Sequence, residues 1–162
     1  MDQLFSPWRM QYVLRIPDVK EDECVFCASP RTENDRDRLI LHRDDDCYVI
    51  LNLFPYNTGH LLVVPYRHVK CMKDLSVRER VQSMDLLVRA ESVLRESFKP
   101  QGFNIGANIG TVAGAGIPGH LHFHILPRWE GDTNFLPVFG GVKSLPEALE
   151  ETYDRMKSAW DS

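Results

Sequence analysis

Short apolar segments alternate with polar turns along most of this 162-residue chain. Leu, Ile and Val recur in runs of strand length, and the acidic residues 44–46 between the first two runs predict a hairpin. A glycine-rich stretch, residues 110–116, separates the last two runs. The segments that we expect as strands are 39–42, 47–54, 60–66, 103–109 and 119–128.

Two longer segments have apolar residues at helical spacing. In residues 76–98 charges separate them, Ser76 and Glu79 predict a capping box, and residues 100–102 end the helix. Residues 144–160 predict a terminal amphipathic helix capped by Ser144. The recurring residues are Val81, Met84, Leu87, Val88, Leu94 and Phe98 in the first helix, and Leu145, Leu149, Tyr153, Met156 and Trp160 in the second.

The order of these elements predicts the fold class. Three strands, a helix, two strands and a terminal helix are typical of an α+β domain on an antiparallel sheet. With 43% apolar and 26% charged residues, the chain is long enough for one core, and it has no internal repeat or linker. We therefore expect a single domain over residues 1–162.

Composition also restricts the partners. We find no apolar run of about 18 residues and no signal peptide at the N-terminus, so we expect a cytoplasmic protein without a membrane partner. The formal net charge of −4 and the lack of a long basic run make a nucleic-acid partner unlikely. Small anionic ligands stay possible, because backbone amides bind them whatever the net charge.

The strongest chemical signal is a row of three histidines, His120, His122 and His124. On an extended strand all three face one side, which favours nucleophilic or proton-transfer chemistry, or metal binding, over a merely structural role. Same-face residues lie about 6.6 Å apart, so the outer two are about 13 Å apart. The three can hardly hold one ion, although two neighbours can with a ligand from elsewhere.

Two further motifs add to this signal. The glycines at 110, 114 and 116 lack the context of a Rossmann or Walker loop, but such a turn can aim amides at an anion. Beside imidazoles it favours attack on phosphorus. Cys24 and Cys27 form a CxxC that indicates half a zinc site or a redox pair.

Residues 120–126 resemble the signature of the histidine-triad (HIT) superfamily. The resemblance includes Asn52, residues 59–65 and Asn108, and covers about residues 24–129. Residues 6–12 and 127–135 resemble a bacterial branch that includes diadenosine tetraphosphate phosphorylases. This resemblance implies a HIT-like fold, with about five antiparallel strands, one long helix and a C-terminal helix.

The resemblance also implies a mechanism. His122 would attack the α-phosphorus of a nucleotide and form a covalent nucleotidyl-histidine, which water or inorganic phosphate then resolves. His124 would contact the phosphate and help stabilise charge on the leaving group. His60 would line the same pocket, and His120 would join it unless a metal binds His120.

The nucleotide contacts are implied by position. Asn52 would bind the ribose hydroxyls and Asn108 the phosphates, with the main chain at Gly116 and Ile117. Ile117 stands where many relatives have Ser or Thr, so any contact there comes from the backbone. Apolar residues would form the slot for the base, namely Val25, Phe26, Ile50 and Leu53.

The resemblance further implies a structural zinc ion held by Cys24, Cys27, His68 and His120, as in some superfamily members and in galactose-1-phosphate uridylyltransferases. It also implies a homodimer formed through the helix at 76–98.

These expectations favour a phosphorylase or hydrolase of dinucleoside polyphosphates, with no organic cofactor and with inorganic phosphate as a possible acceptor. Three alternatives stay open. They are a non-catalytic or weakly catalytic purine-nucleotide-binding module, a nucleoside phosphoramidase or AMP-lysine hydrolase, and a DNA-end processing relative. The acidic balance weakens the last of these.

Overall fold

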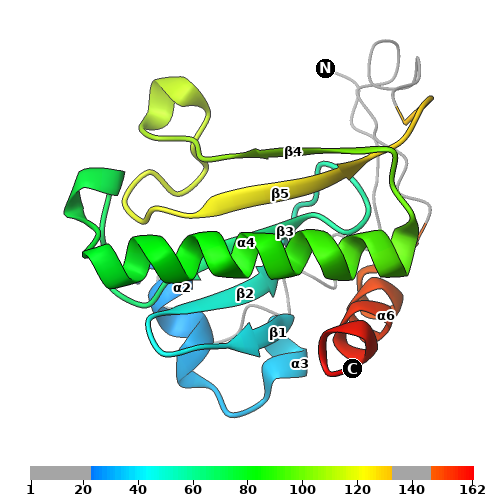
Figure 1. Ribbon diagram of the computed structural model, residues 1–162. Helices are drawn as coiled ribbons and strands as arrows, with labels where there is room; N and C mark the ends of the chain where they lie inside the picture. Colours follow the sequence, from blue (N-terminus) through cyan, green and yellow to red (C-terminus); the bar gives the residue numbers. More distant parts are fainter. Residues whose placement is uncertain (1–22, 133–146) are drawn as a thin grey trace, which may run out of the picture.

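One antiparallel sheet of five strands forms the centre of the molecule, as Figure 1 shows. The computed structural model describes residues 23–132 and 147–162. The strand order β1-β2-β3-β5-β4 leaves β1 and β4 at the edges of the sheet. The strands are β1 (Ile40–Arg43), β2 (Cys47–Leu51), β3 (Leu61–Pro65), β4 (Gly102–Gly106) and β5 (Phe123–Arg128). The predicted α+β class and antiparallel sheet are confirmed.

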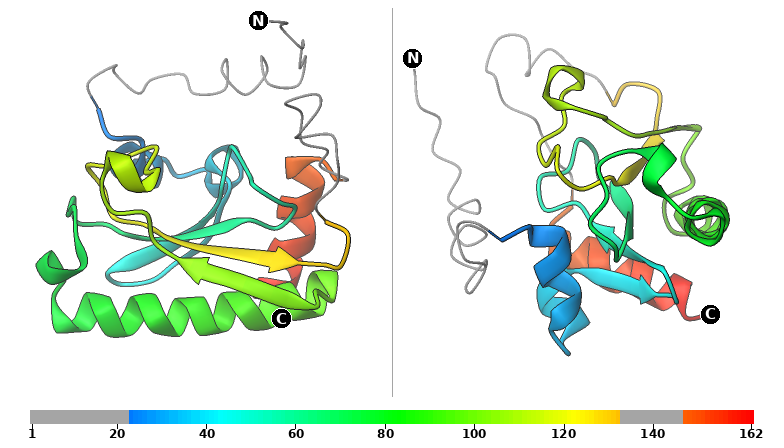
Figure 2. Two further views of the ribbon diagram at one scale, coloured as in Figure 1. Left: turned by 90° about the horizontal axis from the view of Figure 1, so that it is seen from above. Right: turned by 90° about the vertical axis from the view of Figure 1, so that its left-hand side faces the viewer.

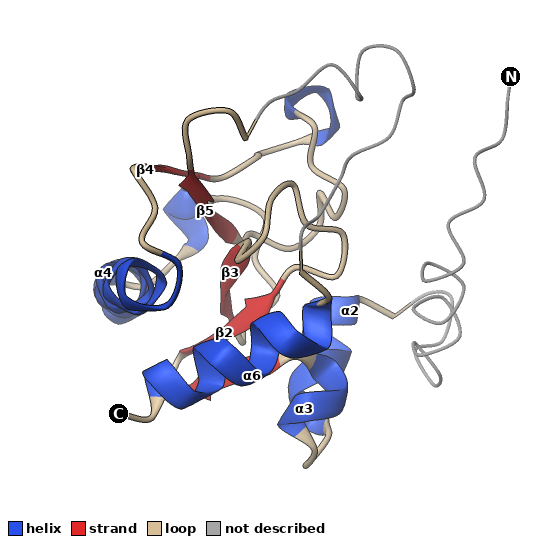
Figure 3. Cartoon of the chain, turned by 90° about the vertical axis from the view of Figure 1, so that its right-hand side faces the viewer, coloured by secondary structure: helices blue, strands red, loops and turns tan. Residues whose placement is uncertain are grey.

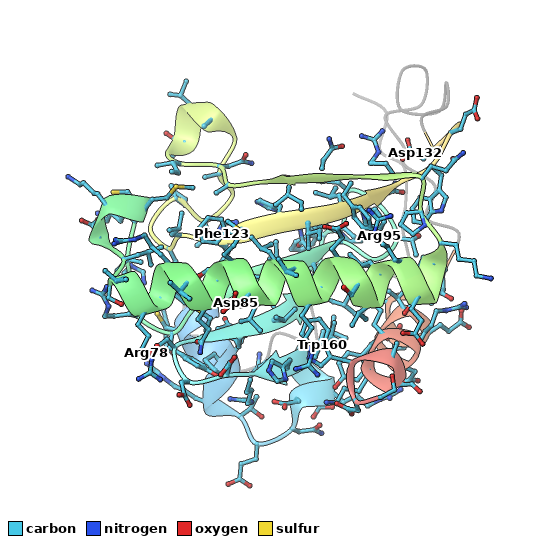
Figure 4. All side chains as sticks on the ribbon, viewed as in Figure 1. Arg78, Asp85, Arg95, Phe123, Asp132 and Trp160 are labelled. Carbon is cyan, nitrogen blue, oxygen red and sulfur yellow. The ribbon has the colours of Figure 1, made fainter. Side chains whose placement is uncertain are left out.

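Helices lie on both sides of this sheet. The long helix α4 (Val77–Phe98) covers one face, and α6 (Leu149–Trp160) packs against α4 and β1. Trp160 of α6, labelled in Figure 4, is buried in the main core. Two one-turn helices, α2 (Val25–Ala28) and α3 (Asp35–Arg38), lie on the side away from α4, as Figures 2 and 3 show. They were not predicted, because four residues are too few for a periodic pattern. Short 3₁₀ turns are η1 (Ser29–Arg31), η2 (Met72–Asp74) and η3 (Thr111–Ala113).

Alternation along the central strands separates two apolar clusters. Val49 and Val63 belong to the main core, which includes the buried faces of α4 and α6. Ile50 and Leu62 belong to a second cluster that contains Phe26 of α2. Because successive side chains point to opposite faces, this second cluster marks the face away from α4. His124 is paired with Leu62 and therefore lies on that face.

The capping box predicted at the start of α4 is confirmed. The Ser76 hydroxyl accepts from the backbone N–H of Glu79, and the Glu79 carboxylate accepts from the Ser76 N–H. The same carboxylate accepts two hydrogen bonds from Arg67, at 2.9 and 2.7 Å. Both contacts fix the segment after β3 to the start of the helix. Among the described helices, none combines the length and the apolar character needed to cross a bilayer.

The prediction of one strand through all three triad histidines is wrong. The strand β5 begins at Phe123, so only His124 of the triad lies in it. The Leu121 N–H instead donates to the Val69 carbonyl at 2.6 Å, and β3 ends at Pro65. Because proline has no N–H for the ladder, the chain before Phe123 bonds to the loop that follows β3.

Other boundaries also differ from the predictions. The terminal helix begins at Leu149 with Ala148 as its N-cap, five residues later than predicted, so the prediction of Ser144 as the cap is wrong. Ser144 and Leu145 themselves lie outside the described residues, as do the motif residues 6–12 and 133–135. The strands predicted at 47–54 and 103–109 end earlier, at Leu51 and Gly106.

Candidate active site

A row of aromatic rings crosses the sheet face away from α4. Neighbouring rings in this row are in contact, and Phe26 lies against both His120 and His122. The centroid distances are 5.0 Å for His68–His120, 5.6 Å for His120–Phe26, 4.8 Å for Phe26–His122, 4.9 Å for His122–His124, 5.1 Å for His124–His60 and 4.9 Å for His60–Tyr56. The structure thus brings together His60, His68 and all three triad histidines.

His122 lies near the middle of the row and is 5% exposed. Its Nδ1 is 2.8 Å from the carbonyl oxygen of His120. A carbonyl only accepts, so Nδ1 carries the ring proton and Nε2 has the lone pair. Burial lowers the pKa of His122, which keeps the ring neutral at pH 7. A neutral imidazole with this tautomer has one nucleophilic nitrogen.

His120 has the opposite tautomer. Its Nε2 is 2.8 Å from the carbonyl oxygen of Pro65 and donates to it. Its Nδ1 therefore has the lone pair, and this atom lies 3.3 Å from Cys24 Sγ and 3.5 Å from Cys27 Sγ. Metal-bound histidines commonly donate the other ring N–H to a carbonyl in this way.

His120 belongs to a cluster with Cys24, Cys27 and His68. One ligand atom from each residue lies within 4.8 Å of the others. In a tetrahedral zinc site with bonds of about 2.1–2.3 Å, ligand atoms are about 3.4–3.8 Å apart, so small movements suffice. Burial raises the pKa of Cys27 to about 11, and a cation offsets such a shift. The donor set fits a divalent ion such as zinc.

At the other end of the row, His60 and His124 are in direct contact. The distance from His60 Nε2 to His124 Nδ1 is 2.9 Å. His124 Nε2 is buried and has no hydrogen-bond partner among the described residues. Burial, with a smaller contribution from His122, lowers the pKa of His124 to about 4. A buried polar atom without a partner is costly, so this nitrogen indicates a ligand position.

The apolar residues predicted for the base lie mainly in one cluster. Phe26 and Ile50 are buried in it, and Val25 and Ile117 pack against it. Phe26 connects the cluster to His122. Leu53 is partly buried, but in the described part of the chain it does not belong to this cluster.

The predicted polar contacts have partners within the protein. The Asn52 amide nitrogen lies 3.2 Å from His60 Nδ1. The Asn108 amide donates to the carbonyl oxygen of Gly114 at 3.4 Å, at a position where Gly114 has a φ of +85° that favours glycine. Gly116 is exposed, beside Ile117. The amides predicted for ribose and phosphate therefore border the loops on either side of the histidines.

The sequence did not indicate Tyr56. Tyr56 is 49% exposed, and its ring is tilted against His60 and stacked on His124, with centroid distances of 4.9 and 6.0 Å. Its backbone N–H donates to His60 Nδ1 at 3.0 Å. The one available signal was an aromatic residue in a polar loop just before a histidine, which is too common to single out a site.

Comparisons with known proteins agree with this geometry. A HIT domain model matches residues 32–131. The chain is 40% identical over 166 residues to an AP-4-A phosphorylase of Mycobacterium tuberculosis, covering 99% of this chain and 85% of the relative. A solved histidine triad nucleotide-binding protein of Sulfolobus tokodaii is similar, with a TM-score of 0.69, 25% identity and coverage of 85% and 92%.

A zinc-bound histidine triad family protein of Mycobacterium smegmatis is similar as well. It has a TM-score of 0.68 at 26% identity and covers 86% of this chain and 94% of its own. The resemblance seen in the sequence is therefore confirmed along most of the chain. This protein belongs to the HIT domain family.

Proposed function

We propose that the protein cleaves dinucleoside polyphosphates at the α-phosphorus, with phosphorolysis as the leading reaction. The observation that carries this proposal is the His120 carbonyl on His122 Nδ1, which leaves the lone pair on Nε2. A neutral imidazole beside an apolar cluster and a second, unpartnered imidazole nitrogen is suited to attack on phosphorus. The similarity to an AP-4-A phosphorylase supports the substrate class.

The reaction then has two steps. The Nε2 lone pair of His122 attacks the α-phosphorus, the bond to the bridging oxygen breaks, and that oxygen leaves with the electron pair as part of ATP. In the second step an oxygen of inorganic phosphate or water attacks the same phosphorus, the N–P bond breaks, and its electrons return to Nε2. The proton of the acceptor goes to solvent.

In this proposal Phe26, Val25 and Ile50 line the slot for the base, and Asn108 contacts the phosphates. Asn52 is within reach of both the ribose and His60. Ile117 offers no hydroxyl to the phosphate, so its backbone and that of Gly116 are the groups available there.

Product analysis tests the proposal. Diadenosine tetraphosphate is incubated with pure protein, with and without inorganic phosphate. ADP plus ATP appearing only with phosphate supports phosphorolysis, and AMP plus ATP indicates hydrolysis. If nucleotide binds but no product forms at any phosphate concentration, the protein is a binding module and the proposed activity is wrong.

We also infer that zinc is the ion held by Cys24, Cys27, His68 and His120. Two thiolates and two imidazoles complete a tetrahedral shell, which is typical of a structural ion. The zinc-bound relative from Mycobacterium smegmatis supports this choice of metal. Such an ion would brace His120, whose carbonyl orients His122.

We further infer a homodimer. Four apolar residues of α4, at positions i, i+4, i+7 and i+11, are more than half exposed, namely Val77, Val81, Met84 and Val88. Ile105 of the edge strand β4 is 50% exposed as well, and it is paired with Ile125 of the main core, which places it on the α4 side of the sheet. A second copy of the chain would cover this apolar surface and extend the sheet from β4.

A single HIT-like domain with its core at about residues 24–129 agrees with these proposals. A cytoplasmic location agrees as well, because a reducing compartment keeps Cys24 and Cys27 available as metal ligands.

A further inference from the structure

We propose that His60 is a positioning residue, which fixes the ring proton of His124 on the nitrogen that faces the substrate. The proposal deepens the proposed function, since it concerns the leaving-group side of the same site. It rests on a chain of hydrogen bonds from the loop after β2 to β5. Each bond in this chain has only one possible direction.

The first link is Asn52, whose amide is oriented by the backbone. Its Oδ1 accepts from the N–H of Phe54 at 3.0 Å, which identifies the oxygen and hence the nitrogen of the side chain. The nitrogen Nδ2 lies 3.2 Å from Nδ1 of His60 and 3.5 Å from Nε2. An amide NH₂ group only donates, so the nearer nitrogen of His60 is an acceptor.

A second donor shows independently that His60 Nδ1 is an acceptor. The backbone N–H of Tyr56 points to His60 Nδ1 at 3.0 Å, and a backbone N–H can only donate. With two donors directed at Nδ1, this atom has the lone pair. The ring proton of His60 therefore lies on Nε2.

The third hydrogen bond fixes the tautomer of His124. His60 Nε2 is 2.9 Å from His124 Nδ1, so the His60 N–H donates and His124 Nδ1 accepts. The ring proton of His124 must then be on Nε2. That atom is buried and has no partner within the described part of the chain. Burial also lowers the pKa of His124 to about 4, which leaves the ring with this one proton at pH 7.

His124 consequently presents an N–H beside the lone pair of His122. The two rings are 4.9 Å apart, a separation that places one on the attacked phosphorus and the other on a neighbouring oxygen. When the bond from phosphorus to the bridging oxygen breaks, the electron pair stays on that oxygen. The Nε2–H of His124 stabilises it by a hydrogen bond, and the proton need not be transferred.

This arrangement favours leaving groups that depart as stable anions, such as the phosphate end of a nucleotide. An amine leaving group must gain a proton, and a neutral His124 that gave up its Nε2 proton would become an imidazolate, because its Nδ1 already accepts from His60. Ile117 provides no hydroxyl that can relay one. The proposed tautomer therefore favours phosphoric anhydrides over phosphoramidates as substrates.

The tautomer can be measured directly in the full-length protein. Long-range ¹H–¹⁵N correlation spectra with ¹⁵N-labelled histidine distinguish protonated from unprotonated ring nitrogens. We expect His124 with a protonated Nε2 and an unprotonated Nδ1, and His60→Leu should convert it to a mixture of both tautomers. A wild-type His124 protonated on Nδ1, or a tautomer that is unchanged in His60→Leu, overturns the proposal.

Kinetics with diadenosine tetraphosphate provide the second readout. His60→Leu should lower kcat by about 10²-fold with little change in KM, because only the alignment of a hydrogen-bond donor to the leaving group is lost. His60→Gln should restore the tautomer and most of the rate, since its amide can accept from Tyr56 and donate to His124. His42→Gln, which replaces a histidine stacked on Trp160 away from the site, is the matched control and should leave kcat unchanged.

The outcomes separate this proposal from the proposed function. If the protein does not cleave nucleotides but the spectra show the expected tautomers and their loss in His60→Leu, the positioning role is supported and the proposed activity is wrong. If the protein cleaves diadenosine tetraphosphate and His60→Leu is as active as His60→Gln, the activity stands and the positioning role is wrong. A His60→Leu protein that does not fold leaves the wild-type spectrum as the deciding measurement.

Discussion

The Nδ1 atom of His122 lies 2.8 Å from the carbonyl oxygen of His120, two residues earlier in the chain. To make this contact, the His122 side chain turns back along its own chain, just before β5 begins. The carbonyl therefore selects the nucleophilic tautomer without any other residue. The side chain of His120 meanwhile faces Cys24 and Cys27, so one residue serves two sites.

We expect that His122→Ala or His122→Asn abolishes turnover while the fold is kept. The nucleophilic nitrogen is lost in both variants, so kcat with diadenosine tetraphosphate should fall by about 10³-fold or more. Circular dichroism and the melting temperature verify the fold, and product formation is followed by chromatography. A rate close to that of the wild type would exclude His122 as the nucleophile.

Much of the fold was predictable from local patterns. The continuous apolar runs at Cys47–Leu51 and Leu61–Pro65 predicted the central strands, and the Ser76 and Glu79 pair predicted the start of α4. The alternating spacing of the three histidines also identified the site, although it predicted a strand that begins too early. The strand β5 begins only at Phe123 because the Leu121 N–H bonds to the Val69 carbonyl, a contact between residues distant in the sequence that no local pattern contains.

The parts of the site that the sequence did not predict also depend on contacts between distant residues. The tautomer of His124 depends on His60 and Tyr56, which a loop of the chain brings together from more than 60 residues away. Val81, Met84 and Val88 recur at helical spacing with Leu87, but periodicity does not distinguish a core from a second apolar surface. The structure separates them, because Leu87 is 4% exposed and the other three are more than half exposed.

Purified protein should contain about one zinc ion per chain. We expect Cys24→Ser to lose the ion and to lower the melting temperature, because a structural metal stabilises the folded state. The variant should be affected less in its rate per folded molecule than in its melting temperature. Elemental analysis and thermal unfolding are the measurements. The matched control is Cys71→Ser, which alters a thiol that is hydrogen-bonded to Asp74 and lies outside the cluster. Fully active, stable protein prepared without chelators and free of zinc would contradict this prediction.

The apolar surface of α4 should hold two copies together. Sedimentation at micromolar protein is expected to show a dimer of the 18.7 kDa chain, and Val81→Asp with Met84→Asp should shift it to a monomer by burying charge in the interface. Glu96→Lys changes an exposed charge on the same helix away from this surface and should keep the dimer. A wild-type monomer at these concentrations would show that the exposed apolar residues have another role.

Glu79 should make the stability of the protein depend on pH in the acid range. Hydrogen bonds from Arg67, and then from Ser76, lower the pKa of the Glu79 carboxyl from an ordinary 4.5 to about 2. The unfolded chain therefore takes up this proton at a higher pH than the folded chain. The stabilisation is fully present above about pH 5 and is lost as the pH falls from there towards 2.

Glu79→Gln isolates this contribution, because glutamine keeps the capping box but carries no charge for Arg67. We expect the variant to melt below the wild type at pH 7, by about 2–4 °C for each kcal/mol lost. The difference should narrow between pH 5 and pH 3, since the wild-type carboxylate loses its advantage as the proton binds. Thermal unfolding followed by circular dichroism at several pH values measures both curves. A difference that stays constant down to pH 3 would mean that the Arg67 contact does not determine the pKa of this carboxyl, and that its effect on stability comes from packing alone.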